Sequence, residues 1–301
     1  MELPPESDLE ELFQAVSNWG RWGPDDELGT LNHITAANVV EAGNLVRSGR
    51  VVSLSHDMDF RWSEKNYNPA VHHMLYLSHD EPVTAVDEVT IVPHSFTVTH
   101  IDAIAHANFG GRIYNGRSAA EITRRNGLEF ASVHALRNGI VTRGVLLDIA
   151  ETRGVNWLEP DEYVTPADLT AAAQLAGVTV RTGDAVLVRV GLSARERIEG
   201  QEDITRRAGL TPDCLRWFHH HEVSLYGGDC FERLPLPYER HPWAFHQIGL
   251  AAMGLVLLDN VEMEALADAC RREDRREFLL SVAPLRLPRA TGSAVNPLAV
   301  F

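Results

Sequence analysis

The spacing of apolar residues predicts several helices. The first 18 residues contain apolar side chains at the three- and four-residue intervals of a single helix face, namely Leu9, Leu12, Phe13 and Val16. Helical patterns extend over residues 7–18, 35–48, 165–176 and 262–276. The helices at 35 and 165 each begin with a threonine, whose hydroxyl can accept a hydrogen bond from the first free amides of a helix. Pro166 then occupies the first helical position, where a missing N–H costs nothing.

Runs of aliphatic and β-branched residues predict strands between these helices. They cover residues 139–149, 183–190, 224–228 and 277–287, and a short strand is expected at the end of the chain. The order lacks the strict alternation of a doubly wound parallel sheet. We therefore expect one α/β domain over residues 1–301, with a mixed sheet and surrounding helices. Residues 1–50 are expected to form a helical arm and a loop that covers the functional site.

Composition excludes several classes of protein. The chain has 301 residues, of which 45% are hydrophobic, and a net charge of −15, so the basic surface of a nucleic-acid-binding protein is not expected. The acidic N-terminus lacks the features of a signal peptide, and no apolar run reaches the roughly 20 residues that span a bilayer. We expect a cytoplasmic protein without a membrane partner, and its three cysteines indicate neither a disulfide framework nor a zinc-binding motif.

The densest group of chemically competent side chains lies in residues 93–116. It contains His94, His100, Asp102 and His106. Imidazole and carboxylate groups suit zinc, manganese or iron(II), and they also suit proton transfer near neutral pH.

Local geometry limits which of these side chains can act together. Residues 95–99 alternate in a strand pattern, and a straight strand would hold His94 about 20 Å from His100. His100 and Asp102 would share one strand face. The alanine-rich run after Asp102 could begin a helix, which would bring His106 within reach of Asp102.

The segment THIDAIAH resembles the signature His-x-Gly-Thr-His-x-Asp-x-Pro-x-His of the cyclase-like metal-dependent hydrolases, a family that includes bacterial kynurenine formamidase and isatin hydrolase. Further similar blocks are GRWGPDDELGTLN, GRVVSL, YNGR, RGVLLDIA, GDAVLVR, MGLVLLDN and EFLLSVAPLRLPRATGSAVNP. The resemblance implies a swivelling β/β/α fold, a homodimer or tetramer, and hydrolysis of amide or ester-like bonds in small aryl or cyclic substrates with zinc or manganese.

The same resemblance implies roles for individual residues. It makes His100 and Asp102 metal ligands and His106 the group that transfers protons. A later histidine or glutamine and an acidic residue complete the site in some members, which here indicates His246 or Gln247, followed by Asp259.

The chain departs from the signature at its first ligand. Phe96 stands in place of the first histidine and Val98 in place of the glycine, and neither can bind a metal. A catalytic zinc site normally has three protein ligands, so a third must come from His94, His246, Gln247 or elsewhere. Two hypotheses follow: a hydrolase that uses a metal with altered ligands, and a metal-free cyclase, dehydratase or isomerase that uses His and Asp side chains. A binding protein without catalysis is a third.

Other residues are candidates for contacts with a small aromatic substrate. Asp229 follows two glycines at the end of a strand and is a candidate catalytic group, together with His106 and His246. Arg21, Trp22 and Phe96 are candidate substrate-binding residues. The tryptophans near residue 20 are expected either to pack into the core or to form a lid. An apolar pocket is expected to draw on Trp19, Trp22, Phe60, Trp62 and Phe96.

Overall fold

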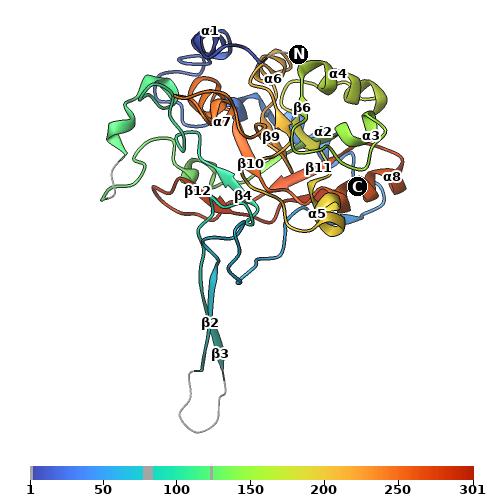
Figure 1. The fold of residues 1–301 in the computed structure, drawn as a ribbon. Coiled ribbons are helices and arrows are strands. Elements are labelled where there is room, and N and C mark those ends of the chain that lie inside the picture. The colour runs from blue at the N-terminus through green and yellow to red at the C-terminus, as the bar shows by residue number, and fades with distance from the viewer. Residues whose placement is uncertain (1–2, 77–83, 123–124) are drawn as a thin grey trace.

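A computed structural model describes residues 3–76, 84–122 and 125–301, and its centre is a nine-stranded mixed sheet (Figure 1). The strand order is β1-β13-β11-β5-β7-β9-β10-β4-β12. These strands are β1 (Val51–Ser53), β4 (His100–Asp102), β5 (Ile140–Asp148), β7 (Ala185–Arg189), β9 (Leu225–Gly228), β10 (Val256–Asp259), β11 (Glu277–Val282), β12 (Gly292–Ala294) and β13 (Leu298–Val300). The predicted fold class, an α/β domain with a mixed sheet and surrounding helices, is confirmed.

The middle of the sheet is parallel and both flanks are antiparallel. Strands β5, β7, β9 and β10 run parallel, and β11 and β4 pair antiparallel with the two outer members of this group. The parallel strands are almost fully buried because both of their faces are covered. Two small two-stranded sheets lie outside, β2 (Val71–Tyr76) with β3 (Ala85–Thr90), and β6 (Tyr163–Val164) with β8 (Gly209–Leu210).

Helices cover the sheet, and some of them begin at a residue whose side chain caps them. The α-helices are α1 (Leu9–Val16), α2 (Ala36–Gly43), α3 (Ile149–Thr152), α4 (Pro166–Leu175), α5 (Leu192–Glu199), α6 (Cys214–His220), α7 (Ala244–Ile248) and α8 (Glu264–Glu273). Short 3₁₀ helices are η1 (Glu6–Asp8), η2 (Gly29–His33), η3 (Tyr114–Gly116), η4 (Ala119–Glu121) and η5 (Val133–Leu136), and α7 continues into one π-helical segment, η6 (Gly249–Met253). The predicted caps are present: Thr35 accepts from the Asn38 amide and Thr165 from the Asp168 amide.

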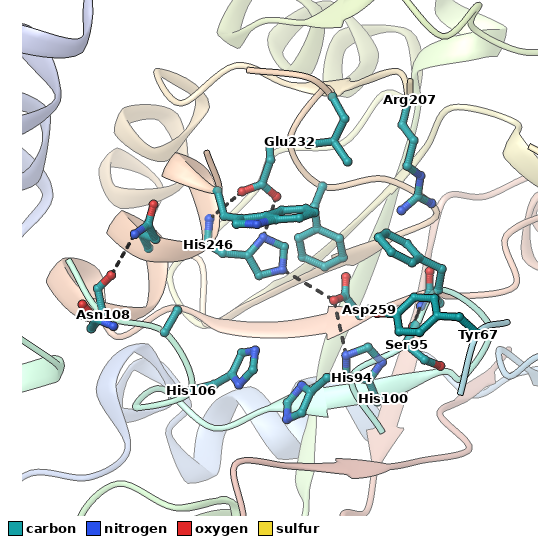
Figure 2. A pocket seen from close by; sticks show the side chains of 17 residues that line it. Tyr67, His94, Ser95, His100, His106, Asn108, Arg207, Glu232, His246 and Asp259 are labelled. Carbon is teal, nitrogen blue, oxygen red and sulfur yellow. Dashed lines mark hydrogen bonds and ion pairs between the residues drawn. The ribbon is translucent and has the colours of Figure 1, made fainter. Parts of the chain in front are cut away.

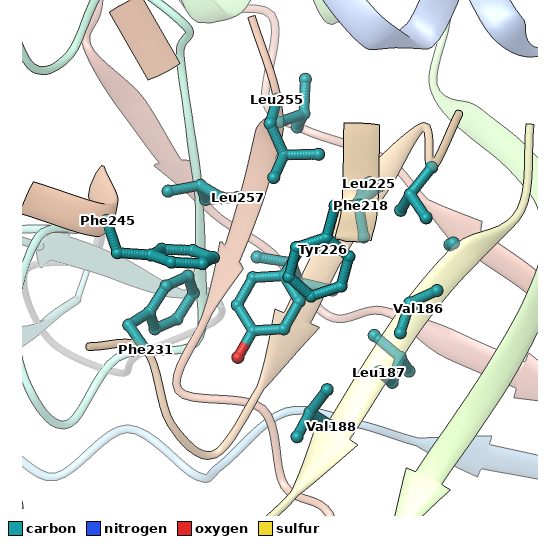
Figure 3. Packing of buried hydrophobic residues seen from close by; sticks show 14 of the residues in the cluster. Val186, Leu187, Val188, Phe218, Leu225, Tyr226, Phe231, Phe245, Leu255 and Leu257 are labelled. Atoms are coloured by element: carbon teal, nitrogen blue, oxygen red, sulfur yellow. The ribbon is translucent and has the colours of Figure 1, made fainter. Parts of the chain in front are cut away.

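Aromatic side chains join the sheet to the helices that carry part of the site. Tyr226 on β9 packs against Phe218 of α6 and Phe245 of α7, with ring centroids 4.9 Å and 5.3 Å away (Figure 3). All three side chains are fully buried. Since α7 carries the next residue, His246, this packing determines where that imidazole lies.

The hairpin formed by β2 and β3 projects away from the rest of the molecule (Figure 1). The polar and aromatic composition of residues 57–87 predicts a hairpin or an excursion over the site, and residues 77–83 of that segment lie outside the described residues. No helix within residues 3–76, 84–122 and 125–301 is both long and apolar enough to cross a membrane.

Candidate active site

The loop before β4 turns back on itself and does not form the predicted strand. The Ser95 hydroxyl accepts from the backbone amides of Thr97 and Val98, at 3.4 Å and 3.2 Å. The Asn260 amide donates to the carbonyl oxygens of Ser95 and Val98. These side-chain hydrogen bonds outweigh the β propensity of the segment. The expected separation of about 20 Å between His94 and His100 was therefore wrong, because their ring centroids lie 5.2 Å apart.

Strand β4 directs His100 and Asp102 to one face and buries Ile101 on the other. His100 pairs with Asp259 across the antiparallel β4–β10 ladder. Its Nδ1 donates to the Val98 carbonyl oxygen at 2.8 Å, which leaves a lone pair on Nε2. That Nε2 lies 3.5 Å from Asp102 Oδ1. It also lies 3.4 Å from Asp259 Oδ2 (Figure 2). His100 and two carboxylates therefore face one point.

His94 and His106 form the opposite wall of this cluster. Their rings stack with centroids 3.7 Å apart and planes 5° from parallel. His94 Nε2 lies 2.9 Å from the Thr291 hydroxyl, and its Nδ1 approaches Asp102 Oδ1 to 2.9 Å. Gly292 leaves room for this ring, because a Cβ there would lie 2.6 Å from His94 Cε1.

The expected helix after Asp102 was wrong, because residues 103–107 form turns. The turn is closed by the His106 amide, which donates to the Ala103 carbonyl oxygen. His106 nevertheless lies within reach of Asp102, as the helix was expected to place it, and these two residues could hold one ion together with His94.

His246 enters the cluster from α7 and is held by a buried carboxylate. Its Nδ1 lies 2.5 Å from Glu232 Oε2, and its backbone amide donates to Glu232 Oε1 at 3.1 Å. Its Nε2 lies 3.5 Å from Asp259 Oδ2 and 4.0 Å from Asp102 Oδ2. Glu232 has a side chain only 1% exposed, so this carboxylate has little water to solvate it.

Burial and neighbouring charges displace three pKa values in the cluster. Burial alone would raise the pKa of Asp102, but the surrounding imidazoles, His106 above all, hold it below its usual range. Burial lowers the pKa of His106 to about 4 even though Asp102 opposes the shift. Burial also disfavours charged His246, yet the Glu232 and Asp259 carboxylates raise its pKa well above the ordinary value. Near neutral pH, His106 is therefore neutral and can accept a proton.

Asp102 has the environment of a cation ligand. Both of its carboxylate oxygens are buried, and neither accepts a well-oriented hydrogen bond in the described parts of the chain, although His94 Nδ1 lies 2.9 Å from Oδ1. Two side-chain groups could hold an ion, His100 with Asp102 and Asp259, and His94 with Asp102 and His106. Because a buried carboxylate without well-oriented hydrogen bonds is costly, a divalent cation between these imidazole and carboxylate donors fits the site.

A cavity of about 370 Å³ opens beside the cluster. The rings of Tyr67, Phe96, Phe231 and Trp243 line it, together with Asn108, Arg207 and Gln247. Phe96, a predicted substrate-binding residue, is part of the cavity wall. Gln247, a predicted metal ligand, also lines it, and its side-chain amide donates to the Asn108 carbonyl oxygen at 3.1 Å.

Three candidate residues lie elsewhere. Arg21 contacts Asn18 and Glu222, and Trp22 packs edge-on against His33, so the N-terminal loop does not bring either one to the cavity.

Asp229 also lies outside the cavity, because it caps a helix. Its carboxylate accepts from the backbone amides of Val190, Gly191 and Leu192 at 2.8–2.9 Å, at the start of α5. The catalytic role predicted for Asp229 finds no support in this placement, because its carboxylate is occupied by the three backbone amides.

The sequence did not indicate that Glu232 contacts His246, because this contact depends on the packing of α7 against β9. The only signal of Glu232 in the sequence is a charge inside the apolar run CFERLPL. Of the aromatic residues expected in the wall, Phe96 lines the cavity; its neighbours there are Tyr67, Phe231 and Trp243, which were not predicted.

Comparisons with known proteins agree with this architecture. A family model described as "Putative cyclase" matches residues 52–232. The crystal structure of a novel cyclase is 27% identical with a TM-score of 0.84, and the alignment covers 95% of this chain and 100% of that one. An isatin hydrolase bound to the product analogue thioisatinate is 18% identical with a TM-score of 0.60, over 89% and 99% of the two chains.

A more distant structure, the predicted metal-dependent hydrolase from Bacillus stearothermophilus, is 14% identical with a TM-score of 0.53, over 84% and 98% of the chains. These last two similarities establish a common fold. Among curated proteins, none matches this chain. The resemblance seen in the sequence is confirmed by the family match over more than half of the residues, and the chain belongs to the Cyclase family.

Proposed function

We propose that this protein is a metal-dependent hydrolase that cleaves an amide or ester-type bond in a small aryl or cyclic substrate. The observation that carries the proposal is Asp102, a buried carboxylate that faces the lone pair of His100 and makes no well-oriented hydrogen bond in the described structure. The fold shared with isatin hydrolases supports the substrate class, as do the aromatic walls of the cavity.

The ligands would come from both sides of Asp102. His100, Asp102 and Asp259 form the more buried group, and His94 would replace the ligand that the signature has at the position of Phe96. A divalent zinc or manganese ion there would supply Lewis-acid activation of water and of the substrate carbonyl. The chain itself orients the donors: the Val98 carbonyl sets the tautomer of His100, and Glu232 sets that of His246.

Proton transfer would be divided between two histidines. Neutral His106 lines the cavity and can accept a proton from the attacking water. His246, held as a proton donor by Glu232 and Asp259, lines the same cavity and can return a proton to the leaving group when no ion occupies its Nε2. The ring stacking of His94 on His106 restricts the orientation of both imidazoles.

A substrate screen tests the proposal. Purified protein without an affinity tag is assayed on aryl amides, cyclic amides, lactones and esters, before and after chelation and after zinc or manganese is restored. We expect turnover that chelation abolishes and the metal restores, and a loss of at least about 100-fold in Asp102→Asn. Asp268→Asn, an exposed change on α8, is the matched control and retains full activity. Absence of turnover in the metal-loaded protein contradicts the proposal.

The contact between Glu232 and His246 favours a second candidate, a metal-free cyclase, dehydratase or isomerase. An imidazole between two carboxylates retains its proton near neutral pH, so it can serve as a general acid and is a weaker metal ligand. Turnover that survives complete chelation and depends on His246 supports this second function. The homodimer or tetramer expected from the resemblance is checked by light scattering of the purified protein.

A further inference from the structure

The one arginine among the residues that line the cavity, Arg207, has no assigned role in hydrolysis. Figure 2 shows it directed into the cavity from the side away from His94, His100 and His106. Its side chain is 11% exposed, so most of it is enclosed. Its guanidinium lies over the ring of Phe96, 5.2 Å from the centroid, which extends the aromatic wall with a positive charge.

The position of Arg207 is fixed through both its backbone and its side chain. Its amide and carbonyl pair with those of Leu234, which also lines the cavity, at 3.1 Å and 3.0 Å. Its Nε donates to Glu202 Oε2 at 3.0 Å, and that carboxylate is almost completely buried. A guanidinium held at Nε presents its two terminal nitrogens as a fixed pair of donors.

The charge around Arg207 is balanced without using those terminal nitrogens. Glu202 is shared with Lys65, whose Nζ lies 3.2 Å from it and 2.7 Å from Glu196. Two cations and two carboxylates therefore form a group with no net charge. Within residues 3–76, 84–122 and 125–301, Glu202 is the one hydrogen-bond acceptor of the guanidinium, so its outer edge remains available.

We propose that Arg207 binds a carboxylate on the substrate, and thereby selects aromatic substrates that carry an acidic group distant from the bond to be cleaved. The inference rests on the proposed hydrolase function for the cleavage, but the anion site stands independently of it. A ring of the substrate would pack against Phe96, which places its acidic group beside the guanidinium and its scissile bond toward the histidine cluster. A planar guanidinium matches a carboxylate in two parallel hydrogen bonds.

The kinetic test uses matched substrates, formanilide and its 2-, 3- and 4-carboxylate derivatives. Loss of a charge-assisted hydrogen-bonded pair lowers kcat/KM by about 10- to 100-fold. We expect Arg207→Gln to show that loss on the best carboxylate isomer and less than a twofold change on formanilide, with Arg207→Lys in between. Equal losses on both substrates would mean that Arg207 only supports the wall, and would overturn the proposal.

A binding measurement separates this proposal from the proposed function. Calorimetry with benzoate and benzamide is carried out on chelated protein, so that no ion competes for the carboxylate. We expect wild type to bind benzoate at least tenfold more tightly than benzamide, and Arg207→Gln to remove the preference. If Arg207→Gln does not fold, Arg207→Lys replaces it in this measurement. We expect the lysine variant to prefer benzoate over benzamide less strongly than wild type does. If the protein hydrolyses nothing but shows this preference, only the hydrolase proposal fails; no preference in wild type overturns the anion site.

Discussion

Replacing Glu232 with glutamine should impair the metal site without touching any proposed ligand. The carboxylate accepts from His246 Nδ1 at 2.5 Å and from the His246 backbone amide at 3.1 Å. With a carboxylate at this position, Nδ1 keeps its proton, so loss of the Nε2 proton leaves a lone pair that can bind an ion beside Asp259. A glutamine amide can donate to Nδ1 instead, which moves the proton to Nε2 and removes the lone pair.

The size of the effect follows from the loss of one charged partner. The backbone amide of His246 keeps an acceptor in Glu232→Gln, so the fold should survive. Removing a carboxylate that orients a metal-binding histidine typically lowers metal affinity or activity by about 10- to 100-fold, or ~1.4 to ~2.7 kcal/mol. We expect a change in that range, because Glu232 is fully enclosed and its charge is little screened.

The assay is zinc affinity, measured by competition with a chromophoric chelator, with kcat/KM as a second readout. Glu239→Gln is the matched control, since Glu239 belongs to the same loop but is exposed. Its affinity should equal that of wild type. A Glu232→Gln variant that folds and binds zinc within twofold of wild type would refute the tautomer argument.

Three other variants test separate parts of the account. Asp229→Ala leaves three backbone amides at the start of α5 without their acceptor, so it should lower the free energy of unfolding in urea by about 3 kcal/mol. The kcat per folded molecule should stay unchanged. A tenfold loss of kcat would instead indicate that Asp229 takes part in catalysis. His94→Ala should weaken zinc binding about tenfold and leave the fold intact, whereas unchanged affinity would exclude His94 as a ligand. In chelated wild type, the free energy of unfolding should fall as pH decreases from 6.5 toward 4, because His106 becomes protonated at a higher pH in the unfolded chain than in the folded one. His106→Gln should reduce this dependence of stability on pH. An unchanged dependence would contradict the low pKa of His106.

Local features of the fold were readable from the sequence because neighbouring residues determine them. Thr165 and Pro166 mark the start of α4, and the predicted strand over residues 139–149 corresponds to β5 at Ile140–Asp148. The order of the sheet was not predictable, since it depends on pairings such as β7 with β9 that join distant segments.

The site was predicted in part for the same physical reason. His100, Asp102 and His106 lie within one short segment, so they could be recognised together. The position of His94 beside His100 could not be predicted, because the loop that carries His94 is held by hydrogen bonds from Asn260, which is distant in the sequence. Glu232 could not be assigned, since α7 must pack on β9 before it meets His246.

The most direct test of the central claim is the metal content of tag-free protein, purified without added metal and then equilibrated with zinc or manganese and desalted. Elemental mass spectrometry should find about one ion per wild-type chain, the minimum that the group around Asp102 requires, and far less in Asp102→Asn of equal secondary structure. Folded wild-type protein that retains no divalent metal, or an Asp102→Asn variant that retains as much as wild type, would contradict the claim.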